Sequence, residues 1–158
     1  MLTALLLLAA CTTPSRETSR PDPGDTVPTG GLRVDVVDVT WAGEEGAWVF
    51  TVSLRSPDID CDQYADWWEL LSPEGTLLYR RILNHSHADE QPVARSGDPL
   101  DIASDQRLVA RGHGHPFGYG GVAMSGSMAT GFTADPSITA DFASTVETQE
   151  PLPTECWW

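Results

Sequence analysis

The stretch GLRVDVVDVTWAGEEGAWVFTVSLR at residues 31–55 decides the fold. Apolar residues occupy every second position across residues 32–41, a period of two that is typical of a half-buried β-strand. The phase of this alternation shifts by one at residues 36–37, which predicts a β-bulge there. A turn at residues 43–46 and a second alternating run at residues 48–55 complete the pattern. The stretch therefore predicts a β-hairpin.

Further strand patterns follow along the chain. Residues 64–71 and 76–83 form a second apolar pair around Ser72-Pro73-Glu74-Gly75, a sequence that favours a type I turn. Additional short strands are expected at residues 100–103, 107–113 and 122–130. No stretch shows a helical period with caps. About seven short strands at this spacing predict an all-β fold, an antiparallel β-sandwich of the Ig-like or fibronectin-like type, with a jelly roll as the alternative.

The tryptophans are expected to be mainly structural. Trp48 and one of the neighbours Trp67 and Trp68 should fill the core, because an indole ring buries a large apolar area. The other neighbour should point outward, since successive strand residues face opposite sides. Its ring would then form a stacking platform for a carbohydrate or peptide, or be covered by a loop or by the tail at residues 157–158.

Composition and charge exclude several classes of protein. The 158 residues include 9 basic and 23 acidic side chains, which gives a formal net charge of −14, and every basic residue is Arg. This charge argues against nucleic-acid binding, which depends on basic residues that neutralise phosphates. It also argues against a polybasic membrane-surface protein. The hydrophobic fraction of 41% is too high for a wholly disordered chain.

The N-terminus carries an apolar run, LTALLLLAA at residues 2–10. The run is too short to span a bilayer, which needs about 20 residues, and is typical of a secretory signal. It ends in Leu8-Ala9-Ala10-Cys11, which resembles the lipobox of bacterial lipoproteins. The resemblance implies a signal peptide at residues 1–10 and a lipid on Cys11. The alternative is an ordinary signal cleaved near Ala10, with Cys11 unmodified.

The rest of the chain divides into a tether and a domain. No basic residue precedes the apolar run, so the signal is expected to begin upstream of Met1. Residues 11–30 are rich in Thr, Ser, Pro, Asp and Arg, which predicts a lipid-bearing Cys followed by a disordered tether. Residues 31–158 are expected to form one domain. By resemblance to the enteric sorting rule, Thr12 favours the bacterial outer membrane, at its periplasmic face or on the cell surface.

The two remaining cysteines, Cys61 and Cys156, predict one disulfide, because two cysteines in an oxidising compartment most simply pair. This bond would tie the C-terminal tail at residues 151–158 back to the segment at residues 61–68. The chain-entropy model gives such a loop of about 95 residues a stabilisation of about 4–5 kcal/mol. Neither cysteine lies in a nucleophile motif, which argues against a catalytic thiol.

All four histidines lie in H-x-H pairs. Positions i and i+2 of a strand share a face, so each pair could present two imidazoles together. Carboxylates follow the first pair closely, and two imidazoles with a carboxylate suit Zn or Cu. The candidate metal ligands are His85, His87, Asp89, Glu90, His113 and His115. The alternative is that the first pair only hydrogen-bonds loop backbone and that the second lies in a flexible Gly-rich loop at residues 112–121.

Several arginines fall on or near the predicted strands, where they are expected to pair with carboxylates across strands as a surface ladder of charges. The alternative is a small site for an anion or carboxylate, which an Arg fork binds with two hydrogen bonds. The arginines are Arg80, Arg81, Arg95, Arg107 and Arg111, and the carboxylates are Asp66, Glu69, Asp89 and Glu90.

No nucleophile elbow, P-loop, dinucleotide fingerprint or H-E-x-x-H motif is present, which favours a non-enzymatic role with no required cofactor. Two segments, CDQYADWWE at residues 61–69 and YRRILNHSHADEQP at 79–92, resemble uncharacterised bacterial lipoproteins. This resemblance implies a location in the cell envelope and no particular activity. The expected function is a lipid-anchored, acidic envelope module with a binding or structural role toward an envelope protein or carbohydrate. The alternative is an envelope metal-binding protein that uses both H-x-H pairs with Zn or Cu.

Overall fold

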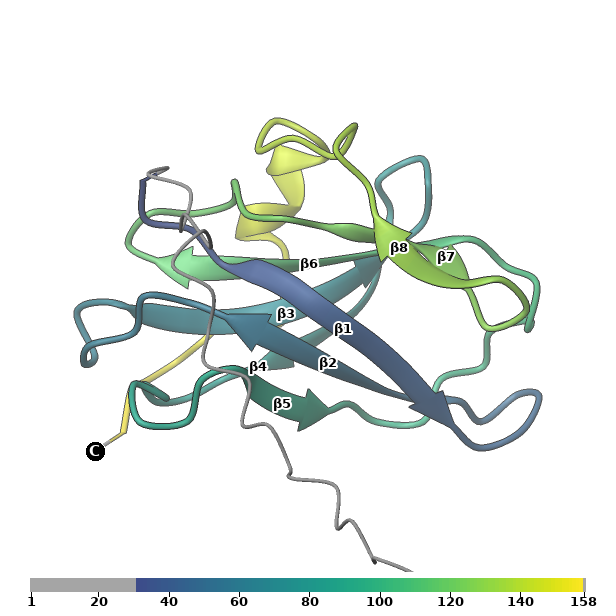
Figure 1. Ribbon diagram of the computed structural model, residues 1–158, viewed down its shortest axis with the longest axis horizontal. Coiled ribbons are helices and arrows are strands. Elements are labelled where there is room, and N and C mark those ends of the chain that lie inside the picture. The colour runs from purple at the N-terminus through teal and green to yellow at the C-terminus, as the bar shows by residue number, and fades with distance from the viewer. Residues whose placement is uncertain (1–30, 158) are drawn as a thin grey trace, which may run out of the picture.

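The computed structural model describes residues 31–157, which fold into two antiparallel β-sheets packed face to face (Figure 1). One sheet has the strand order β1-β2-β5 and the other has the order β4-β3-β6-β7-β8. The strands are β1 (Asp35–Ala42), β2 (Val49–Arg55), β3 (Tyr64–Leu71), β4 (Leu77–Ile82), β5 (Val93–Ser96), β6 (Leu108–His115), β7 (Met124–Ser127) and β8 (Gly131–Ala134). The predicted all-β sandwich is confirmed. The predicted signal peptide, Cys11 and the tether lie outside the described residues.

Strands β1 and β2 form the hairpin that the opening stretch predicts. Their antiparallel register shifts between Val36 and Asp38, so the predicted bulge is confirmed. The alternation turns Phe50, Val52 and Leu54 of β2 inward, and all three are fully buried. Period-two patterning in the sequence thus sets which face of this hairpin meets the core.

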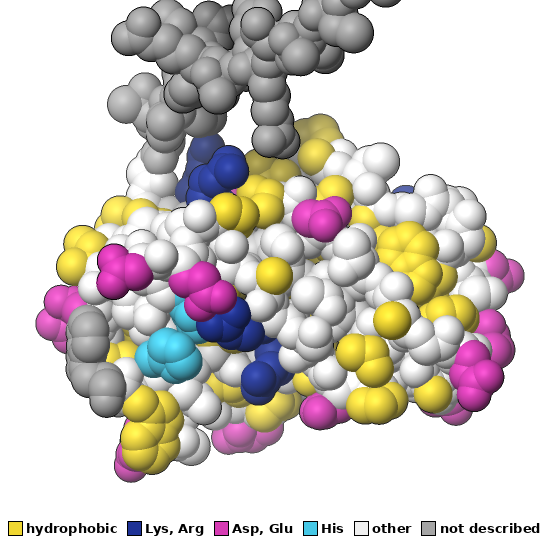
Figure 2. Space-filling model, turned by 60° about the horizontal axis from the view of Figure 1, so that its bottom comes forward, with side chains coloured by type: hydrophobic (Ala, Val, Ile, Leu, Met, Phe, Trp, Pro, Cys, Tyr) yellow, Lys and Arg dark blue, Asp and Glu magenta, His cyan; other side chains and the backbone are white. Residues whose placement is uncertain are grey.

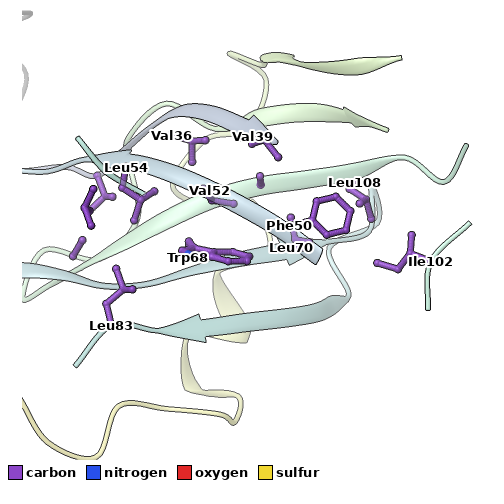
Figure 3. Packing of buried hydrophobic residues seen from close by; sticks show 14 residues of the cluster. Val36, Val39, Phe50, Val52, Leu54, Trp68, Leu70, Leu83, Ile102 and Leu108 are labelled. Atoms are coloured by element: carbon purple, nitrogen blue, oxygen red, sulfur yellow. The ribbon is translucent and has the colours of Figure 1, made fainter. Parts of the chain in front are cut away.

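The main core lies between the two sheets (Figure 3). Trp68 is its largest fully buried side chain, and Trp48 packs against the core while only partly buried. The other buried members are Val34, Val36, Val39, Phe50, Val52, Leu54, Ala65, Leu70, Leu83, Val93, Ile102, Leu108 and Ala110. Contacts on this scale supply the hydrophobic stabilisation of the sandwich. The expected role of Trp68 is confirmed.

Two hydrogen bonds join β1 to the segment that precedes β7 of the five-stranded sheet. The amide of Val36 donates to the carbonyl of Val122 at 2.8 Å, and the amide of Val122 donates to the Asp35 carboxylate at 2.8 Å. A Cβ atom on the adjacent Gly121 would lie 1.7 Å from the carbonyl oxygen of Val34. Glycine is therefore required where the two backbones meet.

The C-terminal strap, residues 138–157, returns across the outer face of the five-stranded sheet, as the yellow segment in Figure 1 shows. It contains a short 3-10 helix, η1 (Ser144–Thr148). A second apolar cluster joins strap to sheet; its buried members are Leu71, Val109, Ala123 and Val146, with Leu77, Ile138, Phe142 and Ala143 packed around them. Strand β3 is consequently buried on both faces.

The strap ends at the predicted disulfide, which is confirmed. Cys61 and Cys156 are bonded with a Cα–Cα distance of 5.7 Å across 95 residues of sequence. Beyond this bond, the amide of Trp157 donates to the carbonyl of Asn84 at 2.7 Å. The end of the strap is thereby held beside two loops, the β2–β3 connection and the β4–β5 connection.

Three strand predictions need correction. The segment at residues 100–103 makes a single bridge, from Leu100 to Trp48, and is not a strand. Strands β5 and β8, each four residues long, were not predicted. The Gly-rich segment expected to be a loop from residue 112 belongs to β6 as far as His115. Gly112 lies there because a Cβ would come within 2.4 Å of the Val34 side chain.

Candidate functional site

A pocket of about 360 Å³ opens at the corner where the β4–β5 connection crosses from one sheet to the other. Its lining consists of Ile59, His85, Ser86, His87, Ala88, Asp89 and Glu90, and we call it the His85–His87 pocket. Figure 2 shows histidine side chains beside arginine and acidic side chains on this face of the protein. Four of the six predicted metal-ligand candidates therefore lie together.

The two imidazoles of the pocket are close but differ in exposure. Their ring centroids lie 4.3 Å apart with the planes tilted by 34°. His85 is exposed, whereas His87 is only 4% exposed. Neither ring nitrogen of His87 has a hydrogen-bond partner among the described residues, and the buried hydroxyl of Ser86 has none either. Three buried polar atoms are thus left unsatisfied at one corner of the protein, which is unusual for a native fold.

The backbone around His87 is firmly held. One carboxylate oxygen of Asp58 accepts the His87 amide at 2.8 Å, and the other accepts the amide of Ala65 at 2.9 Å. The side-chain amide of Gln91 donates to the His87 carbonyl at 3.1 Å. Gln91 is only four residues from His87, whereas nothing in the sequence indicates that Asp58, 29 residues earlier, contacts His87. Together they fix the backbone of His87.

The charges near the pocket act on the histidine in opposite directions. Burial lowers the pKa of His87 below its ordinary value of 6.5, and the nearby Arg95 and His85 lower it further. Asp58 and Glu90 act in the opposite direction. The carboxylate of Glu90 accepts hydrogen bonds from Arg95 at 2.7 and 3.0 Å, which lower the pKa of Glu90. On balance these surroundings favour the neutral form of His87, in which the ring has one lone pair and one N–H group.

The second H-x-H pair lies on β6 and is placed differently. The ring nitrogens of His113 contact Asp66 at 2.6 Å and Glu147 of the strap at 3.1 Å. His115 is exposed, and its ring centroid lies 6.0 Å from that of Tyr64. No three His, Cys, Asp or Glu side chains within residues 31–157 converge on a common metal position. Whether the six candidates bind metal stays a prediction.

A buried ion network lies on the outer face of the five-stranded sheet, beneath the strap. Glu69 is fully buried and contacts two arginines, Arg80 at 2.6 Å and Arg111 at 2.8 Å. The pairing of these arginines with Glu69 was expected, but a surface ladder is the wrong description, because both guanidinium groups are buried. The strap covers them, and nothing local in the sequence indicates this long-range contact.

The same two arginines hold the strap in place. Arg80 donates to the carbonyls of Val146 at 2.7 Å, Gln149 at 2.6 Å and Pro151 at 3.1 Å. Arg111 donates to the carbonyls of Phe142 and Ala143. Each guanidinium thus joins one buried carboxylate to several strap carbonyls. This arrangement satisfies the fixed fork of donors on arginine.

Trp67 faces the same covered layer. Its ring stacks on that of His113 with 3.6 Å between centroids and an interplanar angle of 4°, and the guanidinium of Arg80 lies 4.4 Å from its centroid. Trp67 is only 3% exposed. Of the two possibilities, an open stacking platform is wrong and a covered ring is confirmed, with Arg80 and His113 as part of the cover.

Part of this chain is similar in sequence to an archaeal protein that is named as a lipoprotein. A protein of the archaeon Halomicrobium mukohataei, which carries a provisional lipoprotein name, is 37% identical over 108 residues. The alignment covers 67% of this chain and 53% of the relative, so the chain spans about half the length of the protein it matches. No family model matches the chain, and no solved structure matches it significantly. The relative's name specifies no activity.

No helix within residues 31–157 is long and apolar enough to cross a membrane.

Proposed function

We propose that this chain is a lipid-anchored β-sandwich module of the cell envelope, attached to a membrane through Cys11. The observation that carries the proposal is the sequence Leu8-Ala9-Ala10-Cys11 at the end of an apolar run. The lipoprotein name of the archaeal relative supports the same assignment. The disulfide between Cys61 and Cys156 fits an oxidising compartment outside the cytoplasm.

The role of the module is binding or structural, toward an envelope protein or a carbohydrate. The sandwich supplies a rigid body, and the tether of 19 residues from position 12 to 30 would give it a reach of about 25 Å by random-coil scaling. The net charge of −14 favours solubility of the exposed domain. The charge gives no reason to expect nucleic acid as a partner.

The finer location within this proposal is the outer membrane of a bacterium. Thr12, which follows the proposed lipid-bearing Cys11, favours this location by the enteric sorting rule. The relative adds nothing to that rule, because its source is an archaeon. Separation of inner and outer membranes, followed by immunoblotting of each fraction, tests this part of the proposal.

Detergent phase partitioning tests the anchor itself. The full gene, expressed in the cells that naturally make it, should yield a protein that enters the detergent phase and incorporates labelled fatty acid. Cys11→Ser should move the protein to the aqueous phase and remove the label. The matched control is the double variant Cys61→Ser/Cys156→Ser, which should keep the label because its Cys11 is intact. A wild-type protein without label in the aqueous phase would contradict the proposal.

A further inference from the structure

The chain contains a single asparagine, Asn84, and it is followed by His85 and Ser86. Asparagine, then any residue except proline, then serine or threonine is the acceptor sequence for N-linked glycosylation in proteins that leave the cytoplasm. The triplet is short, so its surroundings in the fold decide whether it has the character of a modification site.

Asn84 lies where an attached sugar has room. It is exposed and belongs to the connection between β4 and β5. Its backbone carbonyl accepts a hydrogen bond from the amide of Trp157 at 2.7 Å, which holds the main chain at this point. None of the side-chain hydrogen bonds within residues 31–157 involves the Asn84 amide group. The side-chain nitrogen of Asn84 is therefore free to carry a substituent.

The hydroxyl of Ser86 has no structural partner within residues 31–157, although it is buried. Buried hydroxyl groups are normally hydrogen-bonded, so the fold gives no reason for a serine at this position. The acceptor sequence does give a reason, because it requires a hydroxyl two residues after the asparagine. Since folding buries this hydroxyl, an enzyme would have to recognise Ser86 before the β4–β5 connection packs.

The surface around Asn84 is unusually apolar. Ile59 and Trp157, at 62% and 57% exposure, are the two most exposed of the large hydrophobic residues within residues 31–157. Trp157 is bonded to the Asn84 backbone, and Ile59 lines the His85–His87 pocket beside it. Figure 2 shows hydrophobic side chains next to the histidines on this face. A sugar ring can cover such side chains with its apolar face while its hydroxyls stay in water.

The polar groups of the pocket suit a neutral ligand that is rich in hydroxyls. Arg95 and Glu90 form an ion pair at 2.7 Å and so largely neutralise each other. Asp89 and His85 also line the pocket, and both are exposed. A carboxylate accepts hydrogen bonds and an imidazole both donates and accepts them, so each can bind a sugar hydroxyl.

We propose that Asn84 carries an N-linked oligosaccharide whose first sugars cover Trp157 and Ile59 at the mouth of the His85–His87 pocket. The donor is an oligosaccharide joined to a lipid through a phosphate, and a transferase of the cell catalyses the step. The side-chain nitrogen of Asn84 attacks the anomeric carbon, a C–N bond forms, and the C–O bond to the phosphate breaks. The phosphate leaves with the bonding electron pair, the amide loses one proton to a base, and nothing is oxidised or reduced. This inference rests on the envelope location proposed above.

Peptide mass spectrometry tests the proposal on protein purified from the cells that naturally make it. Trypsin cuts after Arg81 and Arg95 and releases residues 82–95, which contain Asn84. In the wild type this peptide should carry added mass that is lost in sugar-sized steps on fragmentation. Asn84→Gln and Ser86→Ala should abolish the added mass, whereas the matched control Ser86→Thr should retain it, because threonine also completes the acceptor sequence.

The wild-type measurement does not depend on how the variants fold. A wild-type peptide that shows only its unmodified mass would overturn the proposal, and so would added mass that persists in Ser86→Ala. The lipid is read separately, on the peptide that contains Cys11, so a glycan without a lipid contradicts only the anchor, and a lipid without a glycan contradicts only this inference.

Quenching of tryptophan fluorescence by acrylamide tests where the sugars lie. Asn84→Gln should be quenched more strongly than the glycosylated wild type, because the exposed Trp157 ring loses its cover. The difference should vanish when both proteins also carry Trp157→Ala. Equal quenching of the wild type and Asn84→Gln, or a difference that survives Trp157→Ala, would overturn the placement of the glycan over Trp157.

Discussion

Replacement of Glu69 by glutamine is the sharpest test of how the strap is held. One carboxylate oxygen of Glu69 accepts hydrogen bonds from Arg80 at 2.6 and 2.8 Å, and the other accepts from Arg111 at 2.8 Å. All three side chains are at most 4% exposed. Glu69→Gln keeps the shape of the side chain but removes its charge, and so leaves two buried guanidinium groups without a counter-ion.

The expected loss of stability follows from that arrangement. Removal of one partner from a buried ion pair costs about 3–5 kcal/mol, because the remaining charge is desolvated and unpaired. The hydrogen bonds from Arg80 and Arg111 to the strap carbonyls persist in the variant. The expected loss of stability is therefore the cost of the broken ion pair, and not the larger sum of the three charge-assisted hydrogen bonds to Glu69. The free energy of unfolding of Glu69→Gln should therefore fall by that amount.

Urea denaturation followed by tryptophan fluorescence measures this change. Trp67 is buried beside the ion network and Trp68 is buried in the core, so both report on unfolding. Glu74→Gln, at an exposed turn position outside any ion pair within residues 31–157, is the control and should change stability by less than about 0.5 kcal/mol. A loss below about 1 kcal/mol for Glu69→Gln would show that the network is solvated or loosely held, because removal of a charge from an exposed ion pair costs only that much.

Three further predictions concern the disulfide, the pocket and the contact between sheets. Reductant should lower the melting temperature of the wild type but not of Cys61→Ser, with a loss of at most about 4–5 kcal/mol for the bond. The lowered pKa of His87 means that the unfolded chain binds a proton more readily than the folded one, so stability should fall as the pH drops through 6.5, and less so in His87→Gln. Gly121→Ala should destabilise by about 1–3 kcal/mol or more because its Cβ would meet a Val34 backbone atom, whereas Gly31→Ala, which meets nothing within 4 Å, should not.

Each of these predictions has an outcome that contradicts it. Equal melting of the wild type with and without reductant would mean that the disulfide contributes nothing to stability. Parallel pH profiles of unfolding free energy for the wild type and His87→Gln would show that the His87 ring is solvated in the folded protein. Equal chemical denaturation midpoints for the two alanine variants would show that the backbones at Gly121 and Val34 do not approach closely.

Local patterns were enough to predict much of this fold. The hairpin of β1 and β2 is encoded by alternation over about ten residues, and even its bulge at Val36 is visible as a phase shift. The disulfide followed from the number of cysteines and the expected compartment. In each case the signal lies in neighbouring residues or in a simple count, so no knowledge of tertiary contacts is needed.

Long-range contacts account for what was missed. Gly112 looks like a loop residue, but in β6 it makes room for the side chain of Val34, which is distant in the sequence. Arg80 and Arg111 look like surface residues and are buried only because the strap returns over them. Strands β5 and β8 have only four residues each, too few for a clear period.

The candidate site was predicted in part for the same reason. His85, His87, Asp89 and Glu90 are neighbours along the chain, so their gathering around one pocket follows from sequence proximity. The support of His87 by Asp58 depends on how two connections pack against each other, which the sequence pattern does not reveal. The separate role of His113 depends on Glu147 in the strap, 34 residues away.

Intact-mass spectrometry of the mature protein, purified from membranes, decides whether the chain is anchored by a lipid on Cys11. Lipid anchoring predicts that the mature chain begins at Cys11 and that this residue carries the added mass of a lipid. An unmodified N-terminus at or beyond Cys11 would contradict lipid anchoring, because the domain would then have no lipid to hold it at a membrane.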